Sequence, residues 1–103
     1  MPLDYNAYVQ KNLWYLLVGT RGGPIRIKML QLLKKRPYNA NQLSKELDLD
    51  YKTIEHHIKV LKENNIITTS EEKKYGMLYF LSPYLEKNTF LLDEILKKLG
   101  KST

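Results

Sequence analysis

The chain has 103 residues and a formal net charge of +6, from 17 basic and 11 acidic side chains. This length predicts one domain, and 43% hydrophobic with 27% charged residues is typical of a folded globular chain. The absence of cysteine excludes disulfides, thiolate metal sites and a cysteine nucleophile. No apolar run reaches the ~18 residues of a membrane span, and we expect a cytoplasmic protein without a signal peptide.

The excess positive charge lies between residues 21 and 36. This segment has six basic and no acidic side chains, so the rest of the chain balances at eleven against eleven. The basic residues are Arg21, Arg26, Lys28, Lys34, Lys35 and Arg36. A basic balance favours a polyanionic partner such as nucleic acid. A soluble protein that is simply rich in lysine is the open alternative.

Two helices are expected in the first third of the chain. Apolar side chains recur at helical spacing over residues 4–18, and Gly19 ends that helix. Pro24 suits the first position of a second helix, where its missing N–H does no harm. This helix runs to about residue 35, and Pro37 stops it.

Two short helices separated by a tight turn are expected next. Asn39 starts the first, because its side chain and that of Gln42 fit a capping box. Asp50 caps the second, which ends at Asn64-Asn65 because asparagine tolerates left-handed backbone. Apolar residues recur at intervals of three and four in both helices.

Residues 66–70 and 77–81 are expected to form a β-hairpin around a charged loop at 71–76. Pro83 ends the second strand, and residues 84–99 are predicted as one last helix. A helix-turn-helix followed by a hairpin is the winged-helix arrangement. The predicted fold class is therefore mainly α with a small β-hairpin (α+β), a winged helix-turn-helix with an extra helix at each end.

The second short helix has a polar side opposite its apolar stripe, and a helix fits a major groove about 12 Å wide. The start of this helix also offers free N–H groups to a phosphate, and the hairpin tip could contact phosphate or a minor groove. The candidate DNA-binding residues are Asn39, Asn41, Tyr51, Lys52, Thr53, Glu55, His56, Lys59, Lys73, Lys74 and Tyr75. For this helix alone a solvated amphipathic helix is the better interpretation, but the helix spacing and the hairpin favour DNA.

Residues 39–67 resemble the helix-turn-helix of ArsR-like winged-helix regulators, most closely those of archaea. The Thr-Arg-Gly-Gly-Pro run at 20–24 is similar to the entry into the first core helix of the archaeal group. The resemblance covers about residues 20–82 and implies a dimeric transcription regulator with its recognition helices in successive major grooves. It also implies that His57 is half-buried against the core and that His56 faces DNA.

No metal or other cofactor is expected. Metal-sensing members of the family carry cysteine where this chain has residues 44–47, or histidine on the last helix, where this chain has Asp93 and Glu94. His56 and His57 are adjacent, so they point about 100° apart on a helix and do not readily chelate one ion together. No nucleophile motif or phosphate-binding loop is present, so we do not expect an enzyme.

The two terminal helices carry more apolar surface than one small core covers. We expect a single domain over 1–103, with a core at 20–82 and dimerisation helices at 1–19 and 83–103. Burying each large apolar side chain is worth ~1.5–3 kcal/mol, which favours a two-fold dimer. The candidate interface residues are Tyr5, Tyr8, Val9, Leu13, Trp14, Leu17, Leu91, Leu92, Ile95, Leu96 and Leu99. Folding of both helices onto their own core is the alternative.

The predicted function is a sequence-specific transcription regulator that binds double-stranded DNA as a homodimer on a palindromic site. Two alternatives stay open. A winged-helix protein-interaction module of a larger assembly is favoured by Glu55 and by the acidic half of the hairpin loop. A non-specific architectural DNA-binding protein would share the basic balance without sequence preference.

Overall fold

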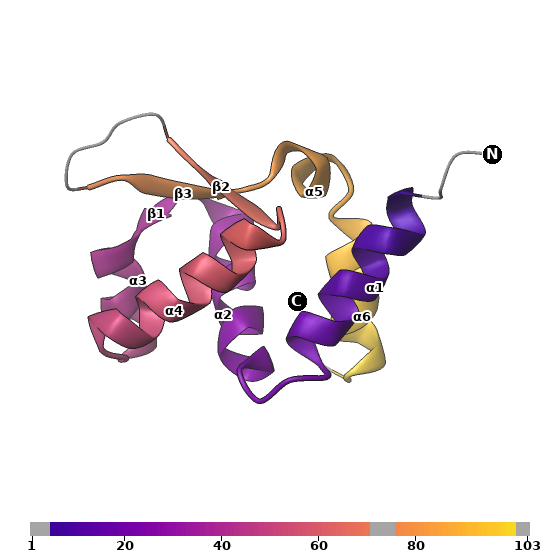
Figure 1. The fold of residues 1–103 in the computed structure, drawn as a ribbon, viewed down its shortest axis with the longest axis horizontal. Helices are drawn as coiled ribbons and strands as arrows, with labels where there is room; N and C mark the ends of the chain where they lie inside the picture. The colour runs from indigo at the N-terminus through magenta and orange to yellow at the C-terminus, as the bar shows by residue number, and fades with distance from the viewer. Residues whose placement is uncertain (1–4, 71–75, 101–103) are drawn as a thin grey trace.

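The computed structural model describes residues 5–70 and 76–100. Its helices are α1 (Tyr5–Leu17), α2 (Gly23–Lys35), α3 (Ala40–Leu47), α4 (Tyr51–Glu63), α5 (Pro83–Lys87) and α6 (Phe90–Lys98). Its strands are β1 (Tyr38–Asn39), β2 (Ile67–Thr69) and β3 (Leu78–Leu81). The strands form one antiparallel sheet in the order β1-β3-β2. The predicted winged helix-turn-helix fold, mainly helical with a small sheet, is confirmed (Figure 1).

Local sequence determines where α3 and α4 begin. The Asn39 side chain accepts a hydrogen bond from the Gln42 backbone N–H at 2.7 Å, and the Gln42 side chain accepts one from the Asn39 backbone N–H at 2.9 Å. The Asp50 side chain accepts from the Thr53 backbone N–H at 2.7 Å and caps α4. Between the two helices, Asp48 adopts left-handed backbone with φ 55° and ends α3. Both predicted helix caps are confirmed.

The sheet has one strand more than the predicted hairpin. β2 and β3 form that hairpin, with Thr68 opposite Phe80. β1 pairs with the other side of β3, with Tyr38 opposite Tyr79. A strand of two residues shows no alternation of polar and apolar side chains, so no local signal marks it. The hairpin loop at 71–75, the predicted wing tip, lies outside the described residues.

The prediction of one continuous helix over residues 84–99 is wrong, because the structure divides this segment into α5 and α6. Asn88 ends α5: its backbone leaves the helical conformation at φ −128°, and its side-chain amide donates to the Tyr84 carbonyl at 2.8 Å. The break redirects the chain, and Leu85 before it and Leu92 after it are both completely buried. Tertiary packing, rather than helix propensity, sets this boundary.

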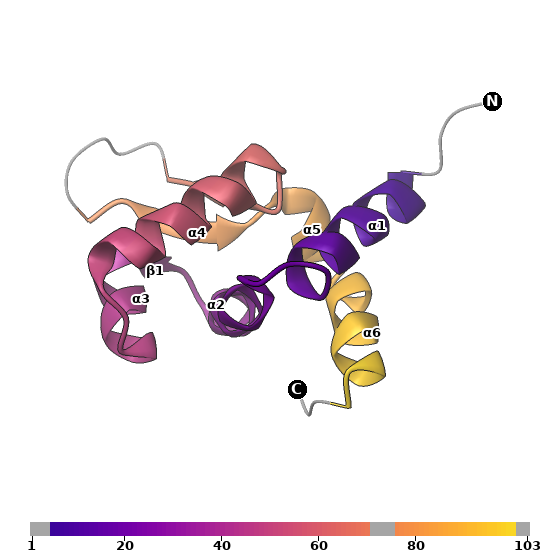
Figure 2. The ribbon, with the colours of Figure 1, turned by 60° about the horizontal axis from the view of Figure 1, so that its bottom comes forward.

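The terminal helices pack against their own chain. Figures 1 and 2 show α1 and α6 together at one end of the molecule and α3 at the other. Seven of the predicted interface residues lie in the chain's own core: Val9, Leu13, Leu17, Leu91, Leu92, Ile95 and Leu96. Because one chain already covers these side chains, a partner cannot reach them, and their assignment to a dimer interface is corrected.

Candidate nucleic-acid interface

Helix α4 presents an exposed polar face on the side opposite its buried stripe. Ile54, Ile58 and Leu61 are buried in the core. The exposed residues Lys52, Glu55, His56 and Lys59 follow the i, i+3, i+4, i+7 spacing of one helix face. Four of the sequence-predicted DNA-binding residues are therefore brought together on one surface, which we call the α4 face.

The remaining predicted DNA-binding residues lie next to the α4 face, cap a helix, or fall outside the described residues. Tyr51 is 49% exposed at the start of α4, whereas Thr53 is half-buried beside it. Asn41 is exposed in the first turn of α3, but the Asn39 side-chain oxygen is engaged in the capping box. The other three candidates lie at 73–75, outside the described residues.

A shallow groove of about 330 Å³ runs between α4 and the sheet, and sequence reasoning missed its tyrosine. Glu55 and Lys59 from α4 line it together with Tyr79 of β3. Burial, followed by the charges of Tyr51 and Glu55, raises the pKa of Tyr79. The phenol therefore keeps its proton at neutral pH and can act as a hydrogen-bond donor beside the α4 face.

Arg26 is a second residue whose role the sequence did not predict. It belongs to the basic segment, but its side chain is only 4% exposed. Its Nε donates to the Leu16 carbonyl at 3.1 Å, its Nη2 donates to the Thr20 hydroxyl, and its Nη1 lies 3.0 Å from His57 Nδ1. One guanidinium thus connects the end of α1, the loop after it and the middle of α4. We call these four residues the Arg26 cluster.

His57 is neutral in this environment. Burial, the Arg26 charge and His56 lower the pKa of His57 from 6.5 to about 4. Because a guanidinium only donates, Nδ1 must accept from Arg26 and the ring proton must lie on Nε2. His57 is 5% exposed, more buried than the half-buried position implied by the family resemblance. His56 is exposed on the α4 face, as that resemblance implied.

Two glycines allow the α1–α2 corner to close around this cluster. A Cβ on Gly22 would lie 2.7 Å from Arg26 Nη1 and 2.8 Å from His57 Cε1. A Cβ on Gly23 would lie 2.1 Å from the Leu17 carbonyl oxygen. A side chain at position 23 would collide with backbone and force the corner apart, whereas one at position 22 would displace the ends of the Arg26 and His57 side chains.

Most of the basic excess lies away from the α4 face. Arg26 is buried, and Lys34 pairs with Asp93 of α6 at 2.7 Å. On the α4 face itself, Lys52 and Lys59 are opposed by Glu55. This surface therefore offers hydrogen-bonding groups of both signs and little net charge, which suits readout of base edges better than bulk phosphate neutralisation.

Helix α1 carries four exposed aromatic side chains. Tyr8 is 57% exposed, Tyr15 62% and Trp14 40%. Tyr8 and Tyr15 are seven positions apart and so share a face of the helix. Tyr5, at 51%, stacks on Tyr8 with ring centroids 6.4 Å apart. Of the predicted interface residues, Tyr5, Tyr8 and Trp14 remain accessible to a partner, and Leu99 is partly so.

Over residues 5–70 and 76–100, no group of three or more histidine and acidic side chains is arranged to hold a metal ion. In the same part of the chain, every helix is too short or too polar to cross a membrane.

The sequence matches a known family model and one curated relative. The model described as bacterial regulatory protein, arsR family, matches residues 23–69, which include α2, α3, α4 and β2. A protein of Methanocaldococcus jannaschii described as an uncharacterized HTH-type transcriptional regulator is 29% identical over 76 residues, covering 74% of this chain and 80% of the relative.

Solved structures share the whole fold at low sequence identity. The transcriptional repressor BigR from Xylella fastidiosa superposes with a TM-score of 0.69 at 19% identity, over 97% of this chain and 95% of that one. A homodimeric winged helix-turn-helix DNA-binding domain from Mycobacterium bovis gives 0.65 at 13% identity, over 94% and 88% of the two chains. At these identities the likeness shows the common fold.

Proposed function

We propose that this chain is a transcription regulator that binds double-stranded DNA sequence-specifically, as a homodimer on a palindromic site; the match of residues 23–69 to the arsR-family model supports this. The family and fold are those of DNA-binding regulators and not of enzymes. We assign residues 20–82 to the DNA-binding core, and 1–19 and 83–103 to dimerisation segments of the single domain. We also propose that it acts in the cytoplasm.

The observation that carries this proposal is the α4 face. Lys52, Glu55 and His56 project from a helix that is capped by Asp50 and anchored by a buried stripe. Lysine reaches guanine or phosphate, glutamate accepts from cytosine, and histidine has ring nitrogens for a base edge. A firmly held helix presents these groups in a fixed geometry, as base readout requires.

The proposed dimer is supported by the end of the molecule formed by α1 and α6, opposite α3. Tyr5, Tyr8 and Tyr15 are exposed on one face of α1 and form an aromatic surface of the kind that marks interaction sites. A two-fold axis through this end would place two α4 helices outward, to read half-sites about 34–36 Å apart. The palindrome of the site would reflect that symmetry. The Mycobacterium bovis domain, which is described as homodimeric, has the same fold.

Selection from a pool of random duplexes tests the specific regulator. We expect one enriched palindrome, with an affinity that falls about 10³–10⁵-fold between 50 and 200 mM salt if six to ten phosphates are contacted. Salt-dependent binding without an enriched site would identify an architectural DNA-binding protein instead. Failure to retain DNA at low salt would leave the protein-interaction module.

Replacing Lys52 and His56 together with alanine tests the α4 face. We expect the sequence preference to be lost, because base-edge contacts supply discrimination of ~1–3 kcal/mol each, while the oligomeric state stays unchanged. The matched control replaces the exposed residues Glu86 and Lys87 of α5 with alanine and should retain the native preference. If the Lys52/His56 variant selects the native site, the assignment of the α4 face is wrong.

A further inference from the structure

A pocket of about 520 Å³ lies between α2, the C-terminal end of α3, and α6. Its lining comes from these three helices and from none of the described residues of α4. Small-molecule sites are typically about 300–1,000 Å³ in volume, so this cavity has the size of a ligand site. It is separate from the α4 face.

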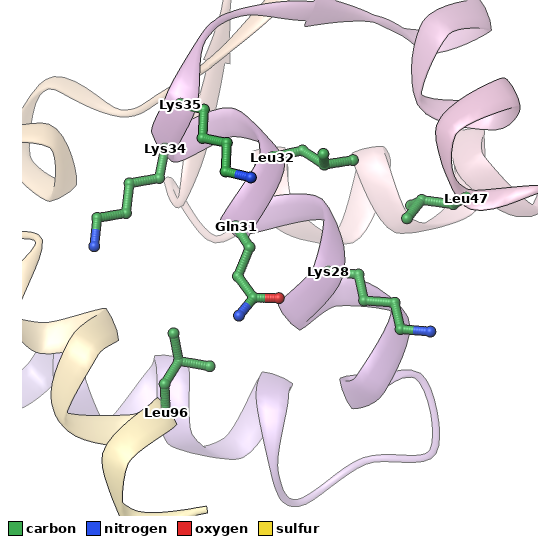
Figure 3. Close-up of a pocket in the computed structure, with 7 residues that line it drawn as sticks. All are labelled: Lys28, Gln31, Leu32, Lys34, Lys35, Leu47 and Leu96. Carbon is green, nitrogen blue, oxygen red and sulfur yellow. The ribbon is translucent and has the colours of Figure 1, made fainter. Parts of the chain in front are cut away.

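One side of α2 forms the floor and the rim of this pocket. Lys28, Gln31, Leu32 and Lys35 line it, and their i, i+3, i+4, i+7 spacing puts them on one helix face. Figure 3 shows these side chains extending from α2, with Leu96 opposite Gln31 and Leu47 opposite Leu32. The two lysines are exposed, whereas Gln31 and Leu32 are half-buried.

The pocket combines an apolar interior with a cationic rim. Leu32, Leu47 and Leu96 come from three different helices, and Leu96 is only 1% exposed. Lysine side chains are the charged groups of the lining, and no carboxylate belongs to it. Among the described residues the one ion pair joins Lys34 of this rim to Asp93, so Lys28 and Lys35 are free of carboxylate partners there.

We propose that this pocket binds an organic anion with an apolar body, of the aliphatic or aromatic carboxylate class. The apolar body would displace water from the half-buried Leu32 and Leu47, beside the buried Leu96 of the lining, and the acid group would accept hydrogen bonds from the ammonium groups of Lys28 and Lys35. A DNA backbone fits less well, because a phosphodiester chain has no apolar part to bury against three leucines. Gln31 supplies a neutral donor and acceptor between the two lysines.

The position of the pocket gives its occupant a route to regulation, an extension that rests on the proposed function. Leu47 ends the first helix of the helix-turn-helix, whereas Leu96 belongs to the terminal helix α6. A ligand in contact with both would favour one relative placement of α3 and α6. The ligand-bound protein would then bind DNA with a different affinity from the free protein. The size of this difference is limited by how much more tightly the ligand binds the favoured placement of α3 and α6 than the other.

Titration of the full chain with octanoate, followed by leucine methyl NMR, tests the site without DNA. We expect saturable shifts at Leu32, Leu47 and Leu96. Acetate lacks the apolar body and octylammonium has the opposite charge, so neither should produce these shifts. Absence of saturable octanoate shifts, or equal shifts with octylammonium, would overturn the proposal.

Replacing Lys28 and Lys35 together with glutamine tests the cationic rim. Loss of two charge-assisted hydrogen bonds should weaken octanoate binding about tenfold or more. Both residues are exposed, and the same spectra report whether the fold is intact. Lys87→Gln removes a charge outside the pocket and should bind octanoate as the native chain does. Native octanoate affinity in the Lys28/Lys35 variant would contradict the assigned rim.

DNA titrations with and without octanoate separate the site from its regulatory role. We expect octanoate to change the DNA affinity of the native chain and to leave that of the Lys28/Lys35 variant unchanged. Octanoate binding with no effect on DNA would refute the regulatory role and keep the site. A native chain that binds octanoate but no DNA would refute the proposed function alone. Loss of DNA binding in the variant, with no octanoate binding by the native chain, would assign the lysines to DNA phosphates.

Discussion

Arg26 illustrates how a charged residue can serve the interior of a small domain. The guanidinium lies between α1 and α4, where burial lowers the pKa of Arg26, and its five N–H donors are directed at three different partners. A buried charge of this kind is tolerated only when hydrogen bonds replace its hydration. The residue is therefore structural, although its sequence neighbourhood suggested contact with a polyanion.

Replacing Arg26 with methionine should lower the free energy of unfolding by about 2–3 kcal/mol, because the Leu16 carbonyl and His57 Nδ1 lose their donor in a buried setting. Denaturant unfolding measures the change. Arg21→Met removes the same charge from an exposed position and should change the free energy by less than about 0.5 kcal/mol. Equal effects of the two substitutions would mean that the Arg26 cluster contributes nothing to stability.

The depressed pKa of His57 makes stability depend on pH. In the unfolded chain this histidine titrates near 6.5, whereas in the folded chain its pKa is about 4. Between these two pH values the unfolded state binds more protons than the folded state. The contribution of neutral His57 to the free energy of unfolding is therefore complete above pH 6.5 and is lost as the pH falls toward 4. The full loss is at most about 3 kcal/mol.

Unfolding experiments at about pH 7.5 and pH 5 measure this dependence. His57→Gln keeps an acceptor for Arg26 but removes the titration, so its stability should decline less than that of the native chain. His56→Gln, at an exposed position, should retain the native decline. An identical decline in all three proteins would exclude His57 as its source.

At the scale of elements, the helix-turn-helix depends on its caps. Asn39→Ala removes the side-chain acceptor of the Gln42 backbone N–H in the capping box of α3, leaves the bond from the residue 39 backbone N–H to the Gln42 side chain, and should cost about 1 kcal/mol of stability. Asn41→Ala, in the exposed first turn of the same helix, should cost nothing, because alanine is the better helix former. Thermal unfolding of the two variants provides the comparison. A cost at Asn41 equal to that at Asn39 would argue against the capping role.

The elements that sequence could predict are those defined by local signals. Asn39, Asp48 and Asp50 set the helix-turn-helix through hydrogen bonds and backbone preferences within a few residues, and apolar spacing gives the buried faces. β1 exists only through pairing with residues about forty positions away. The break at Asn88 likewise depends on tertiary packing, which buries Leu85 before the break and Leu92 after it. Both features are set by tertiary contacts that no local pattern contains.

The same distinction applies to the candidate site. The α4 face could be predicted because a helix with a known buried stripe has a known opposite side. Tyr79 could not, because it reaches α4 only through the pairing of the sheet. The roles of Arg26 and His57 arise from contact between residues 31 positions apart.

At the scale of the whole molecule, the proposed dimer depends on the surfaces that stay exposed. Seven predicted contacts are internal, which leaves the exposed aromatic side chains of α1, together with Phe90 and the partly exposed Leu99 at the two ends of α6. Replacing Tyr8 and Tyr15, which share one exposed face of α1, with aspartate should shift the protein from a dimer toward a species of 12.2 kDa, because charged groups oppose burial of this face. Size-exclusion chromatography with light scattering measures the mass.

Tyr51→Asp is the matched control, since this aromatic residue is equally exposed but lies on α4. We expect it to weaken DNA binding and to leave the mass unchanged. A native chain of 12.2 kDa at micromolar concentration would count against the dimer altogether. Dissociation caused by Tyr51→Asp would instead place the interface at the helix-turn-helix end.

The closed corner between α1 and α2 has a consequence for the DNA itself. Arg26 joins α1 to α4, and Gly23 lets the start of α2 pack directly against the Leu17 backbone at the end of α1. In a dimer joined through α1, α1 and α4 of each chain would move as one unit, so the distance between the two α4 helices would be fixed. One extra base pair between the half-sites moves the second by about 3.4 Å and turns it by roughly 34°. The dimer would accept a single spacer length in its operators and would bind only one half-site of any other.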